Sequence, residues 1–98
     1  MSREILVWPE AEADLSDAYA WYEDKVRDLG DDFLDEVRRT LGLIRENPFL
    51  YQEVEQGVHR ALVRRFPYSV YFFVSIDLIT VVAVLHQSRR PGTWKNRL

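Results

Sequence analysis

The sequence predicts an α+β fold in which an N-terminal strand and an α-helical hairpin precede a mainly antiparallel sheet of three to four strands, with the hairpin packed on one face. Residues 58–85 form three runs rich in Val, Ile, Phe and Tyr, separated by short breaks at residues 66–68 and 75–77. Connections this short make neighbouring strands antiparallel. Residues 9–46 instead place apolar side chains at helical spacing, on both sides of Gly30.

The elements before this meander are bounded by proline and glycine. A strand is expected over residues 3–8, because Pro9 begins helices more readily than it continues a central strand. The first helix is expected over residues 9–29, with Gly30 as its stop. Asp31 or Asp32 can cap the second helix, which runs to about Glu46 and ends at Asn47-Pro48.

Two segments carry no pattern of helix or strand. Residues 49–57 are expected to form a loop that returns the chain to the sheet. The basic tail over residues 86–98 is broken by Pro91 and Gly92, so an extended or frayed end is expected. The whole chain, residues 1–98, is therefore read as a single domain.

Composition narrows the class of protein. At 47% hydrophobic and 30% charged, the chain matches folded soluble proteins. The absence of cysteine excludes a disulfide scaffold and fits a reducing compartment. The longest apolar run is far too short to span a bilayer, and no signal peptide pattern is visible. A cytoplasmic protein without a membrane partner is therefore expected.

Charge is distributed unevenly along the chain. Residues 1–57 carry 6 Lys and Arg against 15 Asp and Glu, whereas residues 58–98 carry 7 against Asp77 alone. One interpretation is that the basic half seeks an anionic partner. The other is that acidic helices simply balance basic strands within the domain.

Few residues fit known catalytic or cofactor chemistry. His59 and His86 are the only histidines and have no ligand-spaced acidic neighbours, so no metal or other cofactor is expected. No serine has the context of a nucleophile, and there is no glycine-rich phosphate loop. The helix carboxylates are expected on solvated polar faces.

A basic and aromatic set remains as the candidate binding surface. His86 should emerge beside the start of the preceding strand, which brings the tail close to the first strand of the meander. Guanidinium groups there suit phosphates or carboxylates, and exposed aromatic rings suit stacking contacts. The alternative is plain surface charge, with Trp94 packed on the core. The predicted binding residues are Arg60, Arg64, Arg65, Tyr68, His86, Arg89, Arg90 and Trp94.

These residues also carry a family resemblance. The pattern G-V-x-R-x-L-V-x-R-F-P-Y-x-V-Y over residues 57–71, followed by V-L-H-x-x-R-x-P-x-x-W over residues 84–94, resembles the RelE/ParE superfamily of bacterial toxins. The leading W-P-E-A at residues 8–11 and Asn47-Pro48 agree with it. The resemblance covers nearly the whole chain.

The resemblance implies the toxin of a type II toxin–antitoxin system, also described as a plasmid stabilisation protein, with a cognate antitoxin as its binding partner. Ribosome-dependent mRNA endonucleases of the superfamily place an arginine where this chain has Ser69. That departure favours the ParE-like branch, whose members inhibit DNA gyrase by binding, and it leaves enzyme activity uncertain. Direct nucleic-acid binding by this chain alone is not expected.

Two alternatives stay open. If the chain is a RelE-like mRNA endonuclease, its catalytic residues are expected among His86, Arg89 and Tyr71, with the arginine stabilising phosphate charge. The chain can also be an inactive relic that retains only antitoxin binding.

Overall fold

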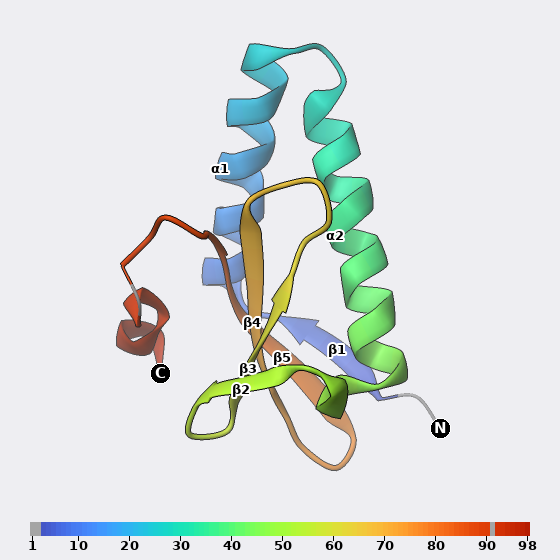
Figure 1. Cartoon of the computed structure of the whole chain (residues 1–98), viewed down its shortest axis with the longest axis vertical. Coiled ribbons are helices and arrows are strands. Elements are labelled where there is room, and N and C mark those ends of the chain that lie inside the picture. The colour runs from blue at the N-terminus through green and yellow to red at the C-terminus, as the bar shows by residue number, and fades with distance from the viewer. Residues whose placement is uncertain (1–2, 91) are drawn as a thin grey trace.

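The computed structural model describes residues 3–90 and 92–98 of the chain. A five-stranded sheet in the order β1-β5-β4-β3-β2 carries the helical hairpin on one face (Figure 1). The predicted α+β class is confirmed, with five strands in place of three to four. The elements are β1 (Glu4–Val7), α1 (Pro9–Lys25), α2 (Leu29–Glu46), the 3-10 helix η1 (Pro48–Leu50), β2 (Gln52–Glu55), β3 (Val58–Leu62), β4 (Tyr68–Val74), β5 (Leu78–His86) and the 3-10 helix η2 (Thr93–Arg97).

Strand β5 lies between β1 and β4 in the sheet. It pairs with β4 in antiparallel and with β1 in parallel orientation, and the long connection that a parallel pair requires consists of the helical hairpin followed by β2, β3 and β4. Tyr71 pairs with Ala83 and Phe72 with Val81, which leaves Val82 as the extra residue of a β-bulge. The bulge shifts the alternation of side chains, so that β5 is buried on both faces from Ile79 to Leu85.

The sheet separates two apolar clusters. The larger one lies between sheet and helices and includes Phe33, Val37 and Ile44 of α2 against Val70 and Phe72 of β4. The smaller one lies on the opposite side of the sheet, called the far face below. Its buried members are Val58, Val82, Ala83, Leu85 and Trp94, so η2 covers part of that face.

The helix boundaries differ from the expectation at one point. Helix α1 ends at Lys25, and Gly30 lies inside α2 rather than stopping α1. Asp28 supplies the left-handed backbone at the turn, with φ of 68°. The Glu23 carboxylate accepts the backbone N–H groups of Asp28 and Gly30, each at 2.9 Å. Gly30 is required for close helix approach, because a Cβ there would lie 2.8 Å from the Tyr19 carbonyl oxygen.

Two segments expected to lack regular structure are ordered. Residues 49–57, expected as a loop, contain most of η1 and the edge strand β2, which pairs with β3. The expected frayed tail instead forms η2 beyond residue 91, and its Trp94 is buried. Pro91 itself lies outside the described residues. Among the described helices, none is long and apolar enough to cross a membrane.

Gly30 and Gly42 lie in the same helix and give a matched test of the helix contact. Gly30→Ala should lower the free energy of unfolding by about 1–3 kcal/mol, because its Cβ would overlap with Tyr19. Gly42→Ala should raise it by about 0.5–1 kcal/mol, since no atom lies within 4 Å of the added Cβ. Urea unfolding measures both. Equal effects of the two substitutions would contradict the close contact.

Candidate functional site

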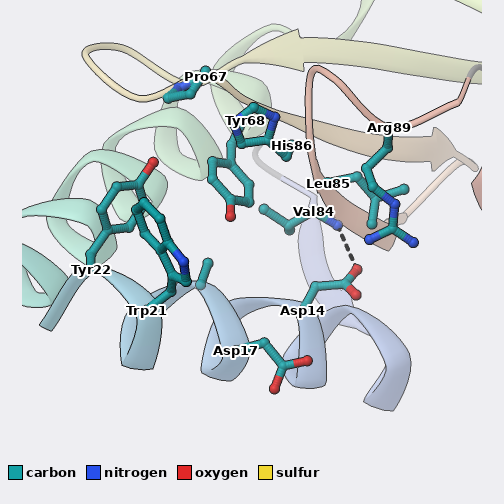
Figure 2. A pocket seen from close by; sticks show the side chains of 11 residues that line it. Asp14, Asp17, Trp21, Tyr22, Pro67, Tyr68, Val84, Leu85, His86 and Arg89 are labelled. Atoms are coloured by element: carbon teal, nitrogen blue, oxygen red, sulfur yellow. Dashed lines mark hydrogen bonds between the residues drawn. The ribbon is translucent and has the colours of Figure 1, made fainter. Parts of the chain in front are cut away.

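A groove of about 600 Å³ lies between α1 and the start of β4 and end of β5, and is called the α1 groove here (Figure 2). Figure 2 shows aromatic side chains at one end and charged ones at the other. The lining residues are Asp14, Asp17, Ala18, Trp21, Tyr22, Pro67, Tyr68, Val84, Leu85, His86 and Arg89.

Trp21 is the exposed residue at the aromatic end. Its ring is 57% exposed and meets Tyr22 edge-to-face at a centroid distance of 5.1 Å. Tyr22 in turn packs against Phe33, Phe66 and Tyr68 in the core, at centroid distances of 5.4, 4.9 and 6.0 Å. The core therefore fixes the ring on which Trp21 rests. A tryptophan held in this way is typical of protein contact surfaces.

Asp14 lies at the charged end and joins three elements. Strand β1 stops opposite Val81, which leaves the following edge of β5 without a strand partner. The Asp14 carboxylate accepts the Val84 N–H at 2.9 Å, and Arg97 donates to both carboxylate oxygens at 2.6 and 2.8 Å. Arg97 also donates to the Val82 carbonyl at 3.0 Å. The expectation that the helix carboxylates are solvated is therefore wrong for Asp14.

Titration of this region follows from burial and pairing. The hydrogen bond to Asp14 raises the pKa of Arg97 above its usual value. Burial raises the pKa of Tyr22, and burial also raises the pKa of Tyr68. At Tyr68 the nearby Arg89 charge opposes the rise.

A second, smaller cleft of about 210 Å³ lies on the far face of the sheet and is called the far-face cleft. Arg60 and Tyr71 are cross-strand partners on β3 and β4, and Arg89 and Lys95 come from the C-terminal segment. Lys95 pairs with Glu55 at 2.9 Å. Within residues 3–90 and 92–98, neither Arg60 nor Arg89 has a carboxylate within 4.0 Å.

The predicted binding residues do not form one surface. Arg60 lines the far-face cleft, Tyr68 and His86 line the α1 groove, and Arg89 borders both. Arg65 turns to α2, where it lies 3.9 Å from Asp32 and 4.0 Å from Glu36. The remaining exposed members are Arg64 and Arg90.

Trp94 is not available as an exposed stacking residue. It is only 3% exposed, and its ring stacks on Tyr71 at a centroid distance of 5.6 Å. The expectation that Trp94 offers a free ring to a partner is therefore wrong, and the alternative that it packs on the core is correct.

The residues expected for a nuclease are also separated. His86 borders the α1 groove and Tyr71 the far-face cleft, while Arg89 borders both. The His86 ring lies edge-to-face on Tyr68 at 5.2 Å, and its Nδ1 accepts the Ser88 N–H at 3.0 Å. Ser69, at the position where the endonucleases carry an arginine, is 1% exposed. Over the described parts of the chain, no three His, Asp or Glu side chains are placed to hold a metal ion.

Sequence reasoning missed three residues of these sites: Trp21, Asp14 and Arg97. Trp21 gave a usable signal, because it lies off the apolar stripe of α1 and such a large ring is rarely left in solvent without a contact to make. Asp14 and Arg97 could not have been found from sequence, because 83 positions separate them and each has the sequence context of an ordinary surface charge.

The comparisons with known proteins agree with this fold. A family model described as the ParE toxin of the type II toxin–antitoxin system parDE matches residues 5–91. The chain belongs to the ParE toxin family. The recognition made from its motifs is thereby confirmed. The match runs from β1 past the end of β5 and stops before η2 of this ParE-family chain.

A solved structure described as the chromosomal ParDE TA system from P. aeruginosa shares the fold of this ParE-family chain. The TM-score is 0.77 at 16% sequence identity, and the alignment covers 87% of this chain and 96% of the other. A comparison with curated proteins gave no match.

The Asp14–Arg97 pair can be tested against an exposed pair of the same kind. Arg97→Met leaves a mostly buried carboxylate without its cation and should lower the free energy of unfolding by about 3 kcal/mol. Arg38→Met breaks the exposed Arg38–Asp35 pair and should cost about 0.5 kcal/mol or less. Urea unfolding of both variants measures the difference, and similar losses would show that the buried pair contributes nothing special.

Alkaline pH should destabilise the protein through Tyr22 and Tyr68. Their folded pKa values lie above the usual 10.0, so the stability from the neutral hydroxyls is complete below about pH 10 and is lost as the pH rises through the raised values. Replacing both with Phe should flatten this alkaline limb. Denaturation midpoints between about pH 8 and about pH 11 measure it, and an unchanged limb in the double variant would contradict the assignment.

Proposed function

We propose that this chain is the toxin of a type II toxin–antitoxin module, that it inhibits DNA gyrase by binding, and that a cognate antitoxin neutralises it by direct contact. The observation that carries the proposal is the ParE toxin match across residues 5–91. The fold shared with the ParDE structure supports it, because that structure is described as a toxin–antitoxin system.

Inhibition by binding, rather than by catalysis, is supported by the residues that line the α1 groove and the far-face cleft. Catalysis of RNA cleavage needs an acid, a base and phosphate-stabilising cations around one bond. Here His86 borders the α1 groove and Tyr71 borders the far-face cleft. Ser69 is buried where a phosphate-binding arginine would be needed. A rigid surface that binds another protein requires no such convergence.

The α1 groove supplies the anchor for such a contact. Trp21 is exposed at the end of the groove where Tyr22 and Tyr68 also line it, and binding energy at protein interfaces concentrates on Trp, Tyr and Arg side chains of this kind. Tyr68, His86 and Arg89 complete the wall with polar groups. The exposed Arg64 and Arg90 are assigned to steering of the approach by charge.

Purified gyrase gives the direct test. The chain should stop ATP-dependent supercoiling of relaxed plasmid, and addition of the antitoxin should restore it. Trp21→Ala should weaken inhibition about tenfold, because a truncated anchor residue costs about 1.4 kcal/mol or more of binding. Ile76→Ala, at a residue that is 94% exposed in the β4–β5 turn, is the matched control and should leave inhibition unchanged.

Two outcomes would overturn this assignment. Primer extension that reveals mRNA cleavage within translated codons, with supercoiling unaffected, would make the chain an endonuclease. Expression without any effect on growth or on supercoiling would make it an inactive relic.

A further inference from the structure

We propose that the aromatic end of the α1 groove binds an arginine side chain from a basic segment of the target, at a position that Lys25 fills in the free protein. The identity of the target, gyrase, rests on the proposed function. The preference for a cation rests on the residues of α1 itself.

The ring of Trp21 already holds a cation. The Lys25 Nζ lies over it, 5.0 Å from the ring centroid. In the part of the chain that the structure describes, Lys25 has no carboxylate within 4.0 Å, so no ion pair holds its ammonium group there. The negative face of an indole ring attracts such a group electrostatically. Because Trp21 is exposed, its ring offers this position to a cation of a partner.

Two carboxylates flank this position without a cation of their own. Asp17 lies four residues before Trp21 and Asp24 three residues after it, so both share its side of α1. Both are exposed, and among the described residues neither has a Lys, Arg or His nitrogen within 4.0 Å. Asp14, farther along the same side, is already paired with Arg97. A cation at Trp21 therefore meets negative charge that the fold leaves unmatched.

Asp24 is not explained by the stability of the helix. It lies in the last turn of α1, which ends at Lys25, and a carboxylate there opposes the helix dipole. Residues that the local structure disfavours are typical of functional surfaces. A contact with a basic partner gives this carboxylate a role that the helix does not.

Arg89 does not neutralise the aromatic end. Figure 2 shows its guanidinium near Asp14, whereas Trp21 and Tyr22 lie at the other end of the groove. A cation that enters beside Trp21 therefore approaches the acidic side of α1 and stays apart from Arg89.

An arginine side chain suits this position better than a lysine. Guanidinium is planar and more weakly hydrated than ammonium, so it can stack on an aromatic face and donate to a carboxylate at the same time. Lys25 makes only the first of these contacts. The incoming arginine displaces Lys25 from the ring and adds a hydrogen bond to Asp17, which lines the groove. A phosphodiester chain or an acidic segment would instead be repelled by Asp17 and Asp24.

The experiment uses the ¹⁵N-labelled chain and an acetylated, amidated tetra-arginine peptide as probe. The indole N–H signal of Trp21 should shift and saturate, whereas those of Trp8 and of the buried Trp94 should not. The Asp17→Asn/Asp24→Asn double variant should bind the peptide about tenfold more weakly, because it loses both carboxylates that flank the ring. Equal binding by the wild type and this variant would overturn the site.

The matched control is Glu46→Gln/Asp77→Asn, which removes two exposed carboxylates outside α1 and changes the net charge equally. It should bind the peptide as the wild type does. A loss of binding as large as in the α1 variant would show attraction by net charge alone and would overturn the site. Amide spectra of both variants verify that they remain folded.

Lys25→Met tests the position on the ring. Removal of the competing ammonium group should tighten peptide binding about threefold. Arg39→Met removes one positive charge from an exposed position on α2 and should leave the affinity unchanged. Equal tightening in both variants would overturn the role of Lys25. Tighter binding of a tetraglutamate peptide than of tetra-arginine at Trp21 would overturn the preference for a cation.

The partner has a separate readout. The Asp17→Asn/Asp24→Asn variant should require about tenfold more toxin to stop supercoiling by gyrase, and it should bind the antitoxin, as measured by calorimetry, like the wild type. Weaker antitoxin binding with unchanged inhibition of gyrase would overturn the assignment of the partner. Failure of the wild type to inhibit gyrase, with the peptide titration intact, would count against the proposed function and leave the cation site in place.

Discussion

The Asp14 carboxylate joins three elements, α1, β5 and η2, at one point. Strand β5 is longer than β1, so part of its backbone edge lies beyond the last strand pair. Unpaired backbone N–H and C=O groups at a buried edge cost free energy. Asp14 accepts the N–H of Val84 and Arg97 donates to the carbonyl of Val82, two backbone groups that β1 does not pair. A helix side chain and a tail side chain thus take the place of a missing strand.

The tail position has consequences on the far face. Because Arg97 is bound to Asp14, η2 lies against β5 and Trp94 packs on the far side of the sheet. Trp94 then backs Tyr71, and Lys95 reaches Glu55 on the edge strand. The far-face cleft exists because these contacts are made. A carboxylate on the helical side of the sheet therefore determines the shape of a cleft on the other side.

Elements of the fold could be predicted from the sequence where they depend on residues close together in the chain, and not where they depend on contacts between distant residues. The meander was predictable, because strand composition and short turns are local signals. Gly30 was wrongly predicted to end the first helix, since a glycine that permits close packing is indistinguishable in sequence from one that ends a helix. Strand β2 was missed because an exposed edge strand, here Gln52–Glu55, tolerates polar side chains on both faces.

The site was predicted less well than the fold, because its contacts join residues remote in sequence. Asp14 and Arg97 are 83 positions apart, and neither carries a mark of burial in its neighbours. The sequence around Trp94 is compatible with an exposed ring and with a buried one. The stacking of Trp94 on Tyr71 decides for the buried ring. Arg60 and Arg89 were selected as part of a larger basic set, but the sheet register was needed to separate them from Arg65.

The sequence left two interpretations of the uneven charge open, internal balance and attraction of an anionic partner, and the structure supports each for different residues. Three basic residues of the second half, Arg65, Lys95 and Arg97, each lie within 4.0 Å of a carboxylate of the first half. For these residues the asymmetry is internal balance. Arg60 and Arg89 have no such carboxylate within the described chain, so their charge is available to a partner. The same asymmetry thus both stabilises the fold and leaves two cations unmatched.

Arg89 lies between the far-face cleft and the α1 groove and borders both. Its guanidinium lies in the α1 groove (Figure 2), where its charge opposes the rise in the pKa of Tyr68 that burial causes. The two arginines without a carboxylate partner therefore do not act on one anion, because the charge of Arg89 belongs to the α1 groove.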